Sequence, residues 1–234
     1  MTRASLRDVA SKAGVSFQTA GKVLNGKGSV SDATRERTLR AARDLLVGSV
    51  YHWTGLLATE HLLRLGHRRV ATVTGSENRQ VTTHRLEGYK RALAEAGVPF
   101  DPSLLESGNW DADGAYEATR RLLDRAPDAT AVFAQNDVMA LGVLSALREK
   151  GLKVPDDQAV VGCVDVPLAA HAASPLTTVH GPFYETGKTA VRLLLDTIAG
   201  VIEKPERVLL PVKLVVRESC GANKVVNGTS SRKG

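Results

Sequence analysis

The sequence predicts a small all-α domain with a helix-turn-helix, followed by an α/β domain built on an open, mostly parallel sheet. Three observations lead to this fold class. Glycine and asparagine separate short, apolar-striped segments within residues 1–47. Strand-like and helical segments alternate from residue 55 onward. Positive charge is concentrated at the N-terminal end of the chain.

The distribution of charge separates a basic module from a near-neutral body. The chain has 234 residues, 43% of them hydrophobic, which is enough for a core and for one or two domains. Of the net charge of +6, residues 1–45 carry +5, residues 46–220 carry −2, and the last 14 residues carry +3. Such a module suits a polyanionic partner. A solvated charged face remains an open alternative on charge alone.

Several classes of protein are disfavoured by what the sequence lacks. No stretch approaches the roughly 20 apolar residues of a membrane span, and no apolar signal region follows Met1, so we expect a cytoplasmic protein without a membrane partner. Cys163 and Cys220 are expected to be reduced thiols. The histidines show no metal-ligand spacing, and neither a Walker loop nor a Gly-x-Ser-x-Gly elbow is present. We therefore expect no catalytic residues, no metal site and no cofactor.

Residues 6–24 are predicted to form two short helices joined by a tight turn. Ser5 can cap the first helix, and Gly14 can end it with a positive φ. Ser16 can cap the second, which runs over residues 17–24 and ends at Asn25-Gly26. Two helices in this arrangement form a helix-turn-helix.

A third helix completes the small domain, because the second helix is too short to be stable alone. Ser31 can cap this third helix, whose inner side is expected to carry Leu39, Ala42 and Leu46. The second helix is then expected to pack through Ala20, Val23 and Leu24. Its outward residues are expected to be Ser16, Phe17, Gln18, Gly21 and Lys22.

The outward residues have the chemistry of base recognition. Gln18 can offer paired donor and acceptor groups to an adenine edge, and Lys22 can reach a guanine edge or a phosphate. Phe17 can press on a thymine methyl group. For Phe17, a further core contact remains an open alternative.

Residues 5–46 resemble the DNA-binding headpiece of the lactose-repressor (LacI-type) family of bacterial transcriptional regulators, which has a lambda-repressor-like fold. The matching runs are Leu6-Arg7-Asp8-Val9-Ala10, Ala13-Gly14-Val15-Ser16, Thr19, Val23-Leu24-Asn25-Gly26, Val30-Ser31 and Thr34-Arg35-Glu36-Arg37. The resemblance implies that Phe17, Gln18 and Lys22 read bases. It places Leu6, Ser16, Thr19, Asn25 and Thr34 near the DNA backbone. Gly21 replaces the usual serine, which costs the helix about 1 kcal/mol relative to alanine and should weaken binding.

The larger domain is expected to alternate helices and strands, with ligands beyond the carboxyl ends of the strands. The expected helices are residues 55–65, 85–96, 113–125, 138–150 and 183–199, and the expected strands are residues 70–74, 131–134, 160–164, 208–210 and 214–216.

Four side chains near these strand ends form the candidate effector site. Arg85 follows a Thr-rich loop, Trp110 lies in a polar loop, and Asn136 and Asp165 follow strands. An aromatic face with convergent polar groups suits a sugar or a nucleoside. Two alternatives stay open: Asn136 and Asp137 can cap a helix, and Trp110 can close a core edge.

Residues 55–220 resemble the regulatory domain of the same family. The matching runs are 61–63, 65–71, 85–89, 136–142, 174–179 and 210–219. The resemblance implies a periplasmic-binding-protein-like fold, with Arg85, Trp110 and Asn136 at effector-contacting positions. Val164 stands where the family has the first of two acids, and Gly181 replaces a polar residue.

The regulatory domain is expected to be incomplete. Residues 47–54 lead almost at once into the middle of the family's domain, without its hinge or the first half of its sheet. The ligand cleft would then have one wall, and exposed edges would need a partner. We expect a DNA-binding domain over residues 1–47, a shortened linker over 48–54, a partial regulatory domain over 55–220, and a disordered tail over 221–234.

The sequence thus favours a DNA-binding regulator, most simply a repressor, that binds a double-stranded operator as a homodimer in the nucleoid and has a reduced effector-sensing domain. The main alternative is a small-molecule-binding module with a vestigial DNA-binding arm. A poorly folding remnant without function is a further alternative.

Overall fold

The structure is a computed structural model that describes residues 6–24, 30–38, 49–199, 208 and 210–222. The chain divides into two compact units, Met1–Val50 and Tyr51–Gly234. The expected roles of Ser5, Asn25-Gly26, Leu39, Ala42 and Leu46, and most of the expected tail, lie outside the described residues.

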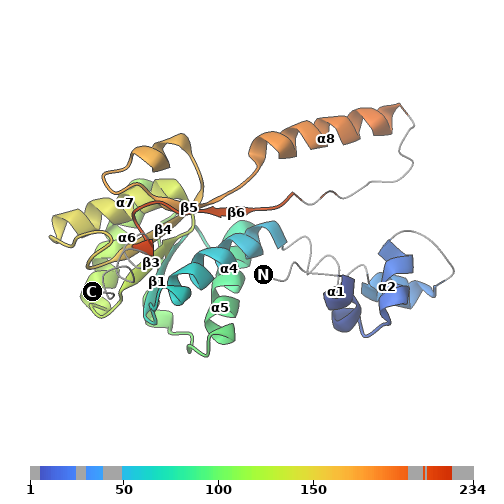
Figure 1. The fold of residues 1–234 in the computed structure, drawn as a ribbon, viewed down its shortest axis with the longest axis horizontal. Helices are drawn as coiled ribbons and strands as arrows, with labels where there is room; N and C mark the ends of the chain where they lie inside the picture. The colour runs from blue at the N-terminus through green and yellow to red at the C-terminus, as the bar shows by residue number, and fades with distance from the viewer. Residues whose placement is uncertain (1–5, 25–29, 39–48, 200–207, 209, 223–234) are drawn as a thin grey trace, which may run out of the picture. The chain divides into compact units, whose positions relative to one another are not determined.

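The first unit contains the expected helix-turn-helix (Figure 1). Helix α1 is Leu6–Ala13 and helix α2 is Phe17–Leu24. Gly14 joins them with φ +61°, a conformation that favours glycine. The Ser16 hydroxyl accepts a hydrogen bond from the Thr19 backbone N–H at 3.1 Å, which confirms the expected cap of α2.

A third helical segment, residues 32–38, packs against this pair. Ser31 caps it through the backbone N–H of Thr34 at 3.4 Å, as expected. The Arg37 side chain donates to the carbonyl of Ala13 at 2.9 Å, which satisfies a carbonyl at the end of α1 and ties the two segments together. The small core of the unit includes Ala10, Ala13, Ala20, Val23 and Thr38. The expected packing of Ala20 and Val23 is therefore confirmed.

The second unit is built on one six-stranded sheet, in the order β2-β1-β3-β4-β5-β6. Neighbouring strands are parallel except for β6, which is antiparallel to β5. The strands are β1 Val70–Thr74, β2 Leu105–Ser107, β3 Ala131–Ala134, β4 Ala159–Val164, β5 Thr177–His180 and β6 Lys213–Val215. The expected open, mostly parallel sheet is confirmed.

Helices cover both faces of this sheet (Figure 1). They are α4 Ser49–Arg64, α5 Gln80–Glu95, α6 Ala112–Arg125 and α7 Asp137–Glu149, with short 3₁₀ helices η1 Pro102–Leu104 and η2 Pro167–His171. A further helix, α8 Phe183–Ile198, follows β5 and stands off from the sheet. On β3, Val132 faces the core cluster under α6 and α7, while Phe133 faces the cluster under α4 and α5. This alternation is what a sheet buried on both sides requires.

The expected elements differ from the observed ones in a few places. Strands β2 and β5 were not expected from the residue pattern, since both are short and rich in polar residues. The strand expected over residues 208–210 is wrong: Val208 is exposed, and Val208 and Leu210 lie outside any strand. Pro211 follows at once, and pairing with β5 begins only at Lys213. Helix α4 begins at Ser49, so residues 49–54 are helical.

Candidate functional site

The first candidate surface is the exposed side of α2. Gln18 and Lys22 are both exposed and lie four residues apart, so they share one face of the helix. Ala20 and Val23 are buried on the other side. A side-chain amide and an ammonium group are thus presented together by a short helix whose back is packed.

The other residues expected at this surface are only partly described. Ser16 is exposed and Thr19 half-buried, and their hydroxyl oxygens lie 2.8 Å apart. The half-buried Thr34 accepts from the Ser31 hydroxyl at 2.9 Å. Asn25 lies outside the described part of the structure. The side chains of Leu6 and Phe17 and the surroundings of Gly21 also lie outside it.

The second candidate site lies at the carboxyl edge of the sheet, where the backbone is strained. Within the described residues, the non-glycine residues with positive φ are Asn109, Trp110, Val164 and Asp165, at 52°, 71°, 115° and 64°. Asn109 and Trp110 follow strand β2, Val164 is the last residue of strand β4, and Asp165 follows it. Val164 is the most unfavourable, because a β-branched residue rarely adopts this region. Such strain gathers at functional sites.

Arg85 and Trp110 meet at this edge. Arg85 is 4% exposed, and its guanidinium donates to the Thr54 hydroxyl at 3.1 Å and to the Gln135 carbonyl at 2.6 Å. Its Cζ lies 5.7 Å from the centroid of the Trp110 ring and 5.4 Å from that of Tyr51. The Trp110 indole N–H is buried without a hydrogen-bond partner. An unmatched buried donor carries a desolvation cost.

Asn136 has a structural role that sequence reasoning left open. Its side-chain oxygen accepts from the Met139 backbone N–H at 2.6 Å, so it caps α7. Its side-chain nitrogen donates to the carbonyl of Trp110 at 3.4 Å. Trp110 also packs against the core cluster beneath α6 and α7. Asn136 therefore caps a helix and Trp110 closes a core edge, as the two open alternatives had it. These roles leave room for a contact with an effector.

Asp137 is not a helix cap but a buried tie between the loop after β4 and strand β5. Its carboxylate accepts from the Thr178 hydroxyl at 2.6 Å and from the Val166 backbone N–H at 2.8 Å. Burial raises the pKa of Asp137, and the hydrogen bond from Thr178 opposes that rise. The loop after β4 is thereby tied to Thr178 within β5.

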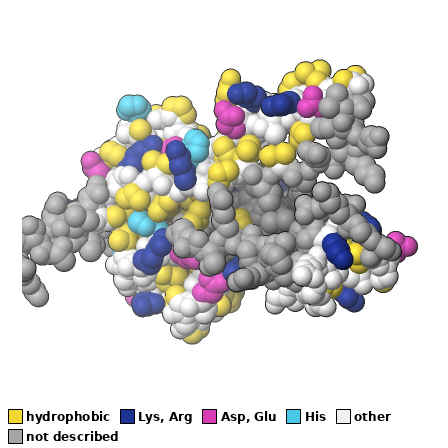
Figure 2. All heavy atoms as spheres, turned by 45° about the vertical axis from the view of Figure 1, so that its right-hand side comes forward, with side chains coloured by type: hydrophobic (Ala, Val, Ile, Leu, Met, Phe, Trp, Pro, Cys, Tyr) yellow, Lys and Arg dark blue, Asp and Glu magenta, His cyan; other side chains and the backbone are white. Residues whose placement is uncertain are grey.

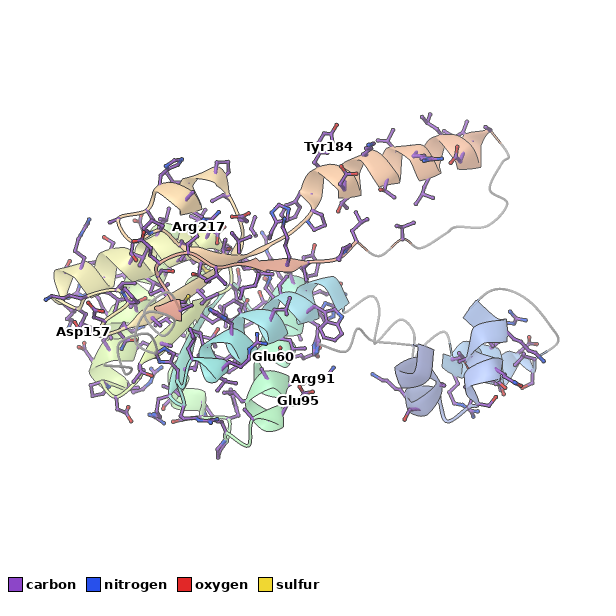
Figure 3. The ribbon with its side chains drawn as sticks, in the orientation of Figure 1. Glu60, Arg91, Glu95, Asp157, Tyr184 and Arg217 are labelled. Atoms are coloured by element: carbon purple, nitrogen blue, oxygen red, sulfur yellow. The ribbon has the colours of Figure 1, made fainter. Side chains whose placement is uncertain are left out.

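Asp165 belongs to an ionic cluster that sequence reasoning did not find. The carboxylate lies 2.8 Å from Arg217 Nη2 and 3.0 Å from His180 Nδ1. Burial raises the pKa of Asp165, but the hydrogen bonds with Arg217 and His180 outweigh it and leave the pKa below its ordinary value. Figure 3 labels Arg217 on the segment that follows β6.

The structure therefore joins three of the four expected effector residues directly. Arg85 contacts Trp110, and Trp110 contacts Asn136, whereas the described hydrogen bonds and ion pairs of Asp165 are with Arg217 and His180. The two departures from the family pattern are neighbours, since the Gly181 N–H donates to the Val164 carbonyl at 3.4 Å.

Among the described residues, no cluster of three or more His, Cys, Asp or Glu side chains could hold a metal ion. None of the described helices has the length and hydrophobicity of a membrane span.

Comparisons with known proteins agree with this architecture. The family described as "Periplasmic binding protein-like domain" matches residues 59–220, and "Bacterial regulatory proteins, lacI family" matches residues 5–45. The HTH-type transcriptional regulator CelR of Thermobifida fusca is 44% identical over 165 residues, which cover 70% of this chain and 48% of that protein. The chain spans about half the length of the curated relatives it matches.

Solved structures of transcriptional regulators are also similar to this chain. A complex of the transcriptional regulator CelR with cellobiose has a TM-score of 0.69 and 29% identity, covering 92% of this chain and 99% of that one. A LacI-family regulator from Enterococcus faecium with bound ribose has a TM-score of 0.68 and 32% identity, covering 82% and 76%.

The fold and its sites define a periplasmic-binding-protein-like α/β domain preceded by a helix-turn-helix, with the α/β domain only partly represented. The chain belongs to the LacI family of bacterial regulatory proteins and is shorter than its relatives. The resemblance and the fold class expected from the sequence are both confirmed.

Proposed function

We propose that the chain is a DNA-binding transcriptional regulator, most simply a repressor, that reads a double-stranded operator with α2. The observation that carries this proposal is the shared exposed face of Gln18 and Lys22 on a helix whose opposite side is buried. A helix held in this way enters a major groove with its base-reading side chains in front. Relatives that match the chain are named as transcriptional regulators.

The proposed division of labour on α2 follows from side-chain chemistry. Gln18 pairs with the N6 and N7 atoms of an adenine, and Lys22 contacts a guanine edge or a phosphate. Phe17 contacts a thymine methyl group. Leu6, Ser16, Thr19, Gly21, Asn25 and Thr34 lie close to the DNA backbone and set the register of the helix.

The regulator acts as a homodimer in this proposal. One eight-residue helix contacts too few base pairs to select an operator, and paired headpieces reading two half-sites supply the missing specificity. The operator is accordingly an inverted repeat.

The proposed effector is a sugar or a nucleoside at the carboxyl edge of the sheet. The Trp110 ring supports this class of ligand, as do the neighbouring Arg85 and Asn136. Solved structures similar to this chain hold cellobiose or ribose. We expect a weak response, because Val164 offers no carboxylate and Asp165 is engaged by Arg217.

Selection from a library of random duplexes by the purified full chain tests the proposed function. The expected result is an enriched inverted repeat, bound far more tightly than an unrelated duplex and more weakly as salt rises from 50 to 200 mM, because phosphate contacts release counterions. Enrichment of no sequence would contradict the proposal. Binding of cellobiose, ribose or adenosine in a calorimeter by a chain that selects no DNA would instead favour the small-molecule-binding module.

A further inference from the structure

Helix α8 carries a continuous apolar face that no described element covers. Six large apolar side chains on it are each between 57% and 79% exposed: Phe183, Tyr184, Val191, Leu194, Leu195 and Ile198. At 100° per residue they fall, with Gly187 and Ala190, within about 140° of the helix circumference. This is the width of a packing face and not of scattered surface residues.

The surroundings of α8 leave this face open. Figure 1 shows the helix standing off from the sheet beyond β5, apart from the other described helices and strands. Figure 2 shows hydrophobic side chains along the helix at the upper right. Figure 3 shows Tyr184 pointing away from the sheet.

The charges of α8 lie on the side away from the apolar face. Glu185, Arg192 and Asp196 are there, and Arg192 and Asp196 form an ion pair of 3.8 Å. With Lys188 at the flank, the helix carries two basic and two acidic side chains and no net charge. Helices that bind anionic membranes instead carry an excess of Lys and Arg on the polar face. The balanced charge therefore favours a protein surface as the occupant.

The area of the face suits a pair of identical helices. The six side chains expose on the order of 600 Å², which equals the largest apolar patch of typical monomers. Two copies face to face would bury about 1,200 Å², the lower end of the range for specific interfaces.

The order of residues along the face is self-complementary in an antiparallel pair. A two-fold axis at Val191 places Tyr184 opposite the second copy's Ile198, and Gly187 opposite its Leu195. A Cβ built at Gly187 would meet nothing within 4 Å, so there is room for the larger side chain. Leu195 thus meets a glycine on both sides of the axis, and the same contacts recur in each copy, as an isologous interface requires.

We propose that α8 is the dimerisation element of this chain, pairing antiparallel with α8 of a second copy around Val191. The inference rests on the proposed function in one respect, since an operator-reading dimer needs a contact between copies. It adds which surface makes that contact and in which orientation. This pairing of two α8 helices requires no DNA and no effector.

Sedimentation equilibrium of the full chain without DNA tests the proposal. The wild type is expected to associate to a dimer. Val191→Glu places a charge at the axis and should raise the dimer dissociation constant at least about tenfold. Arg192→Glu introduces the same side chain on the opposite face and should change the constant less than about threefold. Circular dichroism of each variant checks that the helices and the fold are retained.

Disulfide trapping tests the orientation. Cys163 and Cys220 are both buried, so introduced thiols dominate the reaction. Val191→Cys should form a covalent dimer under mild oxidation, whereas Arg192→Cys should not. A mixture of Tyr184→Cys and Ile198→Cys chains should cross-link to each other more readily than either does alone. Homodimers of Tyr184→Cys as the main product would show a parallel pair and overturn the orientation.

The outcomes separate this inference from the proposed function. A monomeric wild type, or a dimer equally unaffected by Val191→Glu and Arg192→Glu, overturns the role of α8 even if an operator is selected. Sedimentation of the monomer with phosphatidylserine vesicles would assign the face to membranes instead and also overturn it. A dimer that depends on α8 but selects no operator upholds the proposed interface and contradicts the proposed function as a DNA-binding regulator.

Discussion

The indole of Trp110 lies directly on Gly75 at the carboxyl end of β1. A Cβ built on Gly75 would overlap the Cε2, Cζ2 and Nε1 atoms of the ring. Trp110 itself holds a positive φ of 71°, so its backbone and its ring are both constrained. The position of the ring beside Arg85 therefore depends on the absence of a side chain one strand away.

Gly75→Ala is accordingly expected to displace the Trp110 ring. Overpacking of this kind costs about 1–3 kcal/mol of stability. The free energy of unfolding from urea titrations measures the loss, and Trp fluorescence reports the displaced ring. Trp110→Phe separates the signal of Trp110 from that of Trp53. An unchanged spectrum and an unchanged midpoint would show that the ring does not depend on Gly75.

Replacing Gly21 is expected to stabilise α2. Glycine inside a helix costs about 0.5–1 kcal/mol relative to alanine, and Gly21 lies in the middle of the eight residues of α2. Gly21→Ala should raise the midpoint of thermal unfolding of the first unit, which circular dichroism measures. Gly14→Ala is the matched comparison and should lower it, since Gly14 has φ +61°. A lower midpoint for Gly21→Ala would mean that α2 needs glycine for a packing reason.

The ionic cluster at Asp165 is expected to make stability sensitive to acid. The pKa of Asp165 is lowered in the folded protein, so its contribution is present above the ordinary pKa, near 4, and is lost as pH falls through the folded value. Asp165→Asn should reduce the dependence of unfolding free energy on pH below about pH 4. Asp113→Asn changes an exposed carboxylate and serves as the control. Equal slopes in both variants would contradict the prediction.

His61 is expected to produce a second, separate pH dependence. Burial, with the nearby positive charges of Arg64 and His67, lowers the pKa of His61 from 6.5 to about 4. Its Nε2 lies 3.2 Å from the Cys220 sulfur. The unfolded chain therefore binds one more proton than the folded chain between pH 4 and 6.5, so stability falls as pH decreases through this window.

The size of this effect is at most about 1.4 kcal/mol per pH unit for one histidine. Burial also lowers the pKa of His52 and of His67, which adds to the slope of the wild type. The contribution of His61 is isolated by comparing His61→Gln with the wild type, and His171→Gln, an exposed position, is the control. His61→Gln with the full wild-type slope would argue against a buried neutral imidazole.

Local sequence signals predicted the elements that depend on local chemistry. Ser16 and Ser31 were expected as caps and are caps, because a hydroxyl three residues before a free backbone N–H decides where a helix starts. The strand at residues 70–74 and the strand at residues 131–134 were expected with the observed bounds, since short runs of apolar and β-branched residues are typical of strands buried on both faces.

The remaining features depend on contacts between distant residues. Strands β2 and β5 are short and polar, and the neighbouring strands stabilise them. Asp165 pairs with Arg217, which lies 52 residues further along, and periodicity does not report such a pair. The buried tie from Asp137 to Thr178 was missed for the same reason. Asn136 and Trp110 were found at the correct edge, but their hydrogen bonds could be read only from the fold.

The most direct test of the claim that α2 reads DNA is the affinity of the full chain for its selected duplex when α2 is altered. Fluorescence anisotropy compares the wild type with Gln18→Ala, Lys22→Ala and, as control, Lys153→Ala on the second unit. We predict that Gln18→Ala costs about 1–3 kcal/mol and relaxes the preference for one base pair, that Lys22→Ala also weakens binding, and that Lys153→Ala changes little. Unchanged affinity and unchanged sequence preference in both α2 variants would contradict the claim that this helix reads DNA.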